Sequence, residues 1–79
     1  MFTKEELKQE LLRDKKFHYE MTGKDVEILH YEIRNDNKEG AEAELKELIF
    51  FMDLWKDNEV PEWYTREDLK KDIERVKAM

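Results

Sequence analysis

Apolar residues recur at helical spacing in four separate stretches of the chain. Positions three or four residues apart lie on one face of an α-helix, so each stretch indicates a helix with one buried face. The apolar positions are Leu7 and Leu11; Val26, Leu29 and Ile33; Leu45, Leu48, Ile49, Met52 and Trp55; and Leu69, Ile73 and Val76. We therefore predict an all-α fold, a small bundle of about four helices over roughly 4–18, 24–35, 41–57 and 66–78, forming one small domain over residues 1–79.

Three of the expected helix starts share one sequence pattern. An apolar residue precedes Thr3, Thr22 or Thr65, and an acid follows three residues after the Thr, with another apolar residue next. The Thr hydroxyl can accept a backbone N–H of the first turn, and the acid can accept the N–H of the Thr. This capping pattern predicts helix starts near residues 4, 23 and 66.

The second of these regions allows an alternative. Apolar side chains alternate at Phe17, Tyr19 and Met21, and the alternation resumes at Val26 and Ile28, as in a short β-hairpin over residues 17–33. The capping pattern at Thr22 favours the helix. The polar run over residues 35–40 then interrupts the periodicity and predicts an interhelical turn.

The third expected helix, over residues 41–57, is apolar on two sides. Besides its main stripe it carries a second stripe, made of Phe50, Phe51 and Leu54. Such a helix must be covered on both sides. Either it is the central rod of the domain, or its second stripe contacts another chain, which includes a second copy in a homodimer.

Charge is unevenly distributed along the chain. The net charge is −6, yet residues 25–62 contain four basic and twelve acidic side chains, a net charge of −8. Because binding to a phosphate backbone needs clustered cations, we expect no direct contact with nucleic acid and favour a basic protein partner. The longest apolar run, residues 48–52, is far shorter than the roughly 20 residues of a membrane span. The first residues lack the profile of a signal peptide, so we expect a cytoplasmic protein.

The residues that most enzyme sites require are missing. The chain has no Cys and no Ser, and its two glycines cannot form a phosphate-binding loop. His18 and His30 are twelve positions apart, so they do not form a helical metal-binding pair; we expect a helix-terminal His18 and a partly exposed His30. The acids do not follow the spacing of a calcium-binding loop. We therefore expect no enzymatic activity, no cofactor and no metal site.

Surface recognition remains as the expected function. Tryptophan and tyrosine are enriched in binding hot spots, and the candidate partner-binding residues combine aromatic, aliphatic and acidic side chains: Phe50, Phe51, Leu54, Trp63, Tyr64, Asp53 and Asp57. One alternative is DNA mimicry, in which carboxylates occupy the DNA site of a basic protein; the candidates are Glu39, Glu42, Glu47, Asp53 and Asp57. A structural homodimer is another.

Two aromatic-rich segments, residues 48–52 and 60–64, occur in this short acidic chain without catalytic signatures. In this composition the chain resembles the small early proteins by which tailed bacteriophages disable host machinery. The resemblance rests on composition and on no diagnostic motif. It implies an inhibitor that binds a bacterial protein of cell division, transcription, replication or the nucleoid, in the cytoplasm of the host cell.

Overall fold

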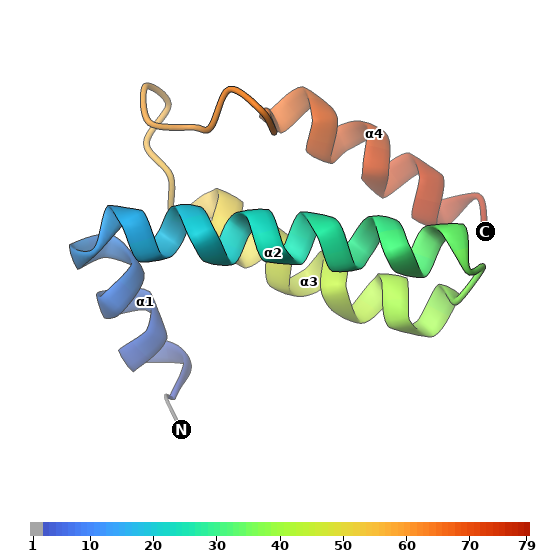
Figure 1. The fold of residues 1–79 in the computed structure, drawn as a ribbon, viewed down its shortest axis with the longest axis horizontal. Helices are drawn as coiled ribbons and strands as arrows, with labels where there is room; N and C mark the ends of the chain where they lie inside the picture. Colours follow the sequence, from blue (N-terminus) through green and yellow to red (C-terminus); the bar gives the residue numbers. More distant parts are fainter. Residues whose placement is uncertain (1–2) are drawn as a thin grey trace.

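Four α-helices make up the part of the chain that the structure describes, residues 3–79 (Figure 1). In this computed structural model they are α1 (Lys4–Arg13), α2 (Lys15–Arg34), α3 (Lys38–Asp53) and α4 (Arg66–Lys77). No β-strand occurs between residues 3 and 79. The predicted all-α fold of about four helices is confirmed, and the alternative hairpin over residues 17–33 is wrong.

The first helix starts as predicted but ends earlier. The Thr3 hydroxyl accepts the backbone N–H of Glu6 at 3.1 Å, and the Glu6 carboxylate accepts the N–H of Thr3. The predicted helix to residue 18 is wrong because Asp14 adopts an extended conformation and caps a new helix, its carboxylate accepting the N–H of Phe17 at 3.1 Å. The apolar residue predicted to precede Thr3, Phe2, lies outside the described residues.

The predicted helix start at Thr22 is also wrong. Thr22 lies inside α2, fully buried, and its hydroxyl donates to the carbonyl of His18, one turn earlier, at 2.8 Å. Gly23 follows within the same helix, although a glycine there costs about 1 kcal/mol relative to alanine. The apolar contacts of α2 outweigh this local preference, so one helix of 20 residues replaces the predicted shorter helix.

The turn between α2 and α3 lies within the predicted polar run and is shorter than expected. Asp36 takes a positive φ of 53°, and Asn37 caps α3 by accepting the N–H of Gly40 at 3.1 Å. Asn and Asp tolerate this left-handed conformation better than most residues. Helix α3 therefore starts three residues before the predicted position, and it ends at Asp53 rather than at residue 57.

A connector of residues 54–65 joins α3 to α4. At its end Thr65 accepts the backbone N–H of Asp68 at 3.3 Å, while Asp68 accepts the N–H of Thr65 at 2.9 Å, which confirms the third predicted cap. The Asp68 carboxylate accepts from both the N–H and the hydroxyl of Thr65, and these two bonds lower its pKa. Tyr64 and Leu69, on either side of this cap, both belong to the hydrophobic core.

The helices pack as an antiparallel pair with two additions. Helices α2 and α3 run antiparallel, α1 packs against α2, and α4 packs against α3 in the opposite direction (Figure 1). The main core is apolar and joins α2, α3, the connector and α4 through Leu29, Ala41, Leu48, Met52, Trp55, Tyr64, Leu69 and Val76. The arrangement is thin, with Cα extents of 35 × 30 × 15 Å, so several large side chains remain half exposed.

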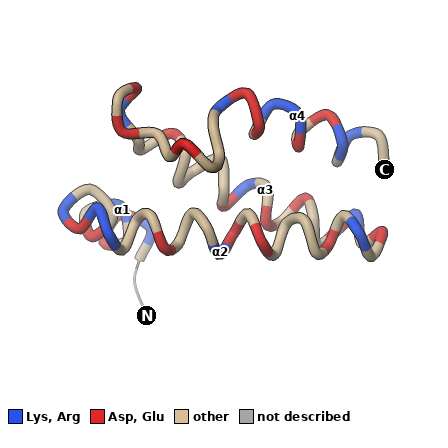
Figure 2. Tube along the Cα trace, turned by 45° about the horizontal axis from the view of Figure 1, so that its top comes forward, with Lys and Arg blue, Asp and Glu red and all other residues tan. Residues whose placement is uncertain are grey.

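Charged residues of both signs are interspersed along α2 and α4, whereas acids outnumber bases on α3 (Figure 2). None of the helices in residues 3–79 has the length and apolar character needed to traverse a lipid bilayer.

Candidate functional site

Trp63 is the most prominent aromatic residue of the connector. Its side chain is 47% exposed, and it meets Tyr19 of α2 edge to face, with ring centroids 5.3 Å apart. The indole lies over Gly23, because a Cβ at that position would be 3.4 Å from Trp63 Cη2. The indole thus lies at van der Waals distance from the position that a side chain would take on this face of α2. We use the name Trp63 surface for the exposed parts of Tyr19 and Trp63 together with the adjoining polar groove. That groove is lined by His30, Tyr64, Asp68, Lys71, Asp72 and Arg75.

A series of aromatic contacts anchors this surface to the core. Tyr19, itself 39% exposed, meets Trp55 edge to face at 5.7 Å. Trp55 is buried and stacks on His18. The contacts run from the buried imidazole to the exposed indole of Trp63, so the connector is held on α2 and Trp63 is fixed in orientation.

His18 lies near a helix terminus as expected, but in the first turn of α2 rather than at the end of α1, and it is fully buried. Its Nε2 lies 2.8 Å from the carbonyl oxygen of Phe51. Since a carbonyl only accepts, Nε2 carries the proton and donates it. Burial lowers the pKa of His18, and its Nδ1 has no hydrogen-bond partner among the described residues. The neutral imidazole is therefore the form that the fold accommodates.

A polar groove of about 310 Å³ adjoins Trp63, between α2 and α4. Its base is the buried carboxylate of Asp72, whose Oδ2 accepts the Tyr64 hydroxyl at 2.6 Å and lies 2.7 Å from His30 Nε2. Arg75 donates to the other oxygen at 3.1 Å. Burial and the adjacent carboxylate raise the pKa of the Tyr64 hydroxyl, so it stays protonated as a donor. Lys71 and Asp68 complete the lining.

The predicted partner-binding residues do not form one patch. Phe51 and Tyr64 are buried in the interior, while Phe50 and Leu54 are half-buried. The second stripe of α3 is thus largely covered within the chain; Lys4 of α1 places its ammonium group 5.3 Å from the Phe50 ring centroid.

The three remaining members of that set are exposed but separate. Asp53 is exposed at the end of α3, and Asp57 forms an ion pair with Arg66. Trp63 is the member that presents a large apolar area. The α2 residues beside it were missed because they are far from it in the sequence: Tyr19 and Gly23 lie against its indole, and His30 lines the adjoining groove. The spacing of 19, 23 and 30 along one helix face was the available signal.

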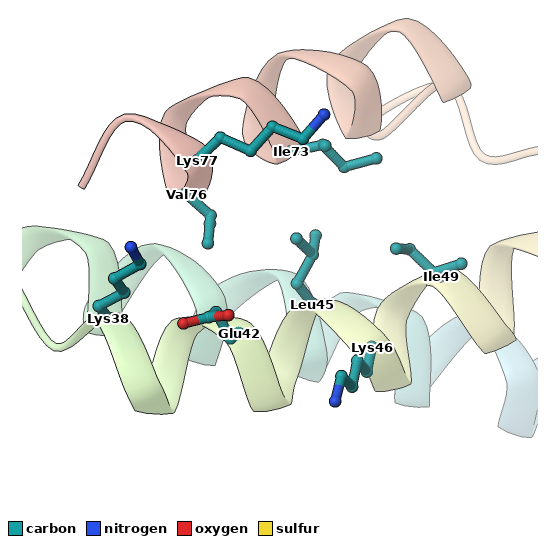
Figure 3. Close-up of a pocket in the computed structure, with 8 residues that line it drawn as sticks. All are labelled: Lys38, Glu42, Leu45, Lys46, Ile49, Ile73, Val76 and Lys77. Atoms are coloured by element: carbon teal, nitrogen blue, oxygen red, sulfur yellow. The ribbon is translucent and has the colours of Figure 1, made fainter.

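A second groove, of about 340 Å³, lies between α3 and α4 (Figure 3). Aliphatic side chains point into it from both helices: Leu45 and Ile49 from α3, and Ile73 and Val76 from α4. Charged side chains surround this apolar floor, from Lys38, Glu42, Lys46 and Lys77.

Three carboxylates meet between α2 and α3. Asp25, Glu44 and Glu47 each contribute an oxygen, and these oxygens lie within 4.8 Å of one another. Burial, together with the negative charges of Glu47 and Glu44, raises the pKa of Asp25 to about 7. Burial and the charges of Glu47 and Glu32 raise the pKa of Glu44 as well. We call these three residues the carboxylate triad; they are the residues of the described chain that are placed to hold a metal ion.

The triad was not expected from the sequence. Asp25 was assigned to a helix cap at Thr22, and that cap does not exist. Glu44 and Glu47 share a helix face at i and i+3, but only the antiparallel packing of α2 on α3 brings Asp25 to them.

Comparison with protein families, with curated proteins and with solved structures yields no match for this chain.

Proposed function

We propose that the protein is a non-enzymatic binding module that docks on a basic partner protein through the Trp63 surface. The observation that carries this proposal is the half-exposed indole of Trp63, held edge-on against Tyr19. Tryptophan and tyrosine dominate binding hot spots because they bury a large area with few rotatable bonds. The acidic segment of residues 25–62, with its net charge of −8, supports a basic partner.

The fixed orientation of Trp63 supports the same function. A side chain that is already held by Tyr19 and by the close approach to Gly23 loses little conformational freedom when a partner covers it. The adjoining groove offers charged groups of both signs, from Lys71, Asp68 and Arg75, to orient the partner.

In line with the phage-like composition, we propose that docking blocks the normal contacts of a bacterial host protein. The targets would belong to cell division, transcription, replication or the nucleoid. Expression in bacterial cells should then produce the matching defect, such as filamentation, arrested transcription or loss of nucleoid order, and Trp63→Ala should remove it.

The test is comparative capture from a bacterial lysate. Wild-type protein, Trp63→Ala and Tyr31→Ala are immobilised at equal density, and the retained proteins are quantified. Tyr31 is the matched control, because it is an exposed aromatic residue of α2, 57% exposed, whose ring makes no aromatic contact within the described residues.

We expect a protein that is retained by the wild type and by Tyr31→Ala but not by Trp63→Ala. With that protein purified, calorimetry should give an affinity at least about tenfold weaker for Trp63→Ala. Equal affinity of all three variants would contradict the proposal. Circular dichroism confirms that each variant is folded.

Salt dependence separates this mode from DNA mimicry. Docking carried by an apolar and aromatic surface predicts an affinity for the basic partner that declines only moderately from low to moderate salt, whereas substitution of carboxylates for phosphates predicts a steep decline. A homodimer through α3 would instead use the groove of Figure 3. Light scattering at several concentrations should show a mass that rises with concentration if that alternative holds, and Ile49→Lys should abolish the rise.

A further inference from the structure

We propose that Asp25, Glu44 and Glu47 form a binding site for one divalent cation of the size of Ca²⁺, between α2 and α3. This site is independent of the Trp63 surface. It places three carboxylate oxygens from two antiparallel helices around one point, and oxygen ligands with full negative charge are those that hard cations prefer.

Burial distinguishes this cluster from an ordinary acidic surface. Asp25 is only 4% exposed, and its Oδ2 has no hydrogen-bond donor among residues 3–79. Oε2 of Glu44 is also buried and also has no hydrogen-bond donor among the described residues. Buried carboxylate oxygens are normally paired, because an unpaired one loses its hydration and gains no hydrogen bond in return. The interior of the helix pair thus contains acceptors whose donor or cation is not supplied by the described chain.

No basic group among the described residues neutralises the triad. Within residues 3–79 none of its members forms an ion pair with Lys, Arg or His, and the groups acting electrostatically on Asp25 and Glu44 are all acids. The next acid, Glu32 of α2, already accepts a hydrogen bond from Asn37 at 2.8 Å. A cation between the helices would attract all three carboxylates and so offset their mutual repulsion. It would link Asp25 of α2 to Glu44 and Glu47 of α3.

The kind of ligand favours Ca²⁺ over Mg²⁺. Three carboxylate oxygens that lie within 4.8 Å of one another can all contact one ion. Ca²⁺ accepts irregular arrangements of carboxylates at about 2.3–2.6 Å, whereas Mg²⁺ demands a near-ideal octahedron at about 2.0–2.1 Å and gives up its water reluctantly. Water would complete the coordination.

Calorimetric titration of the full chain with CaCl₂, with MgCl₂ in a parallel titration, tests the site. We expect one Ca²⁺ per chain, with an affinity higher than that for Mg²⁺. Ca²⁺ should also raise the thermal unfolding midpoint.

Asp25→Asn is the decisive variant, because it preserves shape while removing the buried charge. We expect Ca²⁺ affinity to fall at least about tenfold in this variant. Glu47→Gln, at a more exposed ligand, should also weaken binding. The matched controls are Glu20→Gln on α2 and Glu42→Gln on α3, which each remove one exposed carboxylate outside the triad and should leave the affinity unchanged.

Two results would overturn the site. One is the absence of any Ca²⁺ heat and any thermal stabilisation, in which case the triad holds only a proton. The other is equal binding by Asp25→Asn and the two controls, which would mean that Ca²⁺ associates with the acidic surface in general. Circular dichroism of Asp25→Asn separates lost binding from lost folding.

Discussion

The imidazole of His18 lies flat against the indole of Trp55, with ring centroids 3.7 Å apart and ring planes 4° from parallel. His18 belongs to the first turn of α2, and Trp55 follows the end of α3. With the bond from His18 Nε2 to the Phe51 carbonyl, the stack joins the start of one helix to the end of the other. The break between α1 and α2 at Asp14 is what places His18 here.

The buried histidine should make stability depend on pH. Burial lowers the pKa of folded His18 below its ordinary value of 6.5, so below about pH 6.5 the unfolded chain binds a proton that the folded chain does not. The contribution of His18 to the free energy of unfolding is therefore fully present above about pH 6.5 and is lost progressively as the pH falls below that value. The difference in free energy of unfolding between wild type and His18→Gln should therefore shrink from about pH 7.5 to about pH 5.

Urea denaturation of both proteins across this range measures the difference. Thr22→Val is the control, because it breaks the bond to the His18 carbonyl without removing a titrating group. Its loss of free energy of unfolding relative to wild type should not vary with pH. A pH-independent difference between wild type and His18→Gln would show that the folded state accepts the imidazolium.

Asp25 should make stability depend on pH in the direction opposite to His18. Its pKa is raised to about 7 in the folded state, against 3.8 ordinarily, so its contribution is present at low pH and is lost as pH rises towards 7. In the presence of a chelator, Asp25→Asn should be more stable than wild type by about 2 kcal/mol at about pH 8 and nearly equal to it at about pH 4.5. Chemical denaturation at both pH values measures this, with Glu20→Gln as the control. An Asp25→Asn variant less stable than wild type at alkaline pH would refute the buried charge.

Gly23→Ala should stabilise the fold. Gly23 is in the interior of α2 with no positive φ, and an added Cβ would lie 3.4 Å from Trp63 Cη2, an ordinary contact. We expect a gain of about 0.5–1 kcal/mol, or a few degrees in the thermal midpoint. Gly40→Ala is the contrasting variant, since its Cβ would collide with the Glu32 carboxylate, and it should gain less. If Gly23→Ala were less stable than wild type, the Trp63 side chain would be unable to shift even slightly to make room for the added methyl group.

The donors around Asp72 should share the stabilisation of its buried carboxylate. Tyr64→Phe removes the 2.6 Å bond to the buried carboxylate and should cost about 1–2 kcal/mol in free energy of unfolding. His30→Gln acts on the same oxygen, so the double variant should depart from additivity. Tyr31→Phe is the control and should change nothing. Strict additivity would show that the two contacts are energetically independent.

Local sequence patterns predicted much of the fold. The caps at Thr3 and Thr65, the turn after residue 34 and the apolar stripe of α4 depend on residues within a few positions of one another, so the sequence contains the whole signal. The pattern at Thr22 has the same residue types, but there the apolar contacts of α2 outweigh it. An identical local signal can therefore start a helix or lie in the middle of one.

The sequence by itself determined the helical class, the caps at both ends and the acidic centre, because these follow from short-range periodicity and composition. The tertiary structure alone decided which side chains meet across the helices. It buried Phe51 and Tyr64, left Trp63 half exposed against Tyr19, and brought Asp25 to Glu44 and Glu47. These contacts join residues that are distant in the chain, and they depend on the register of two antiparallel helices, which no local pattern encodes.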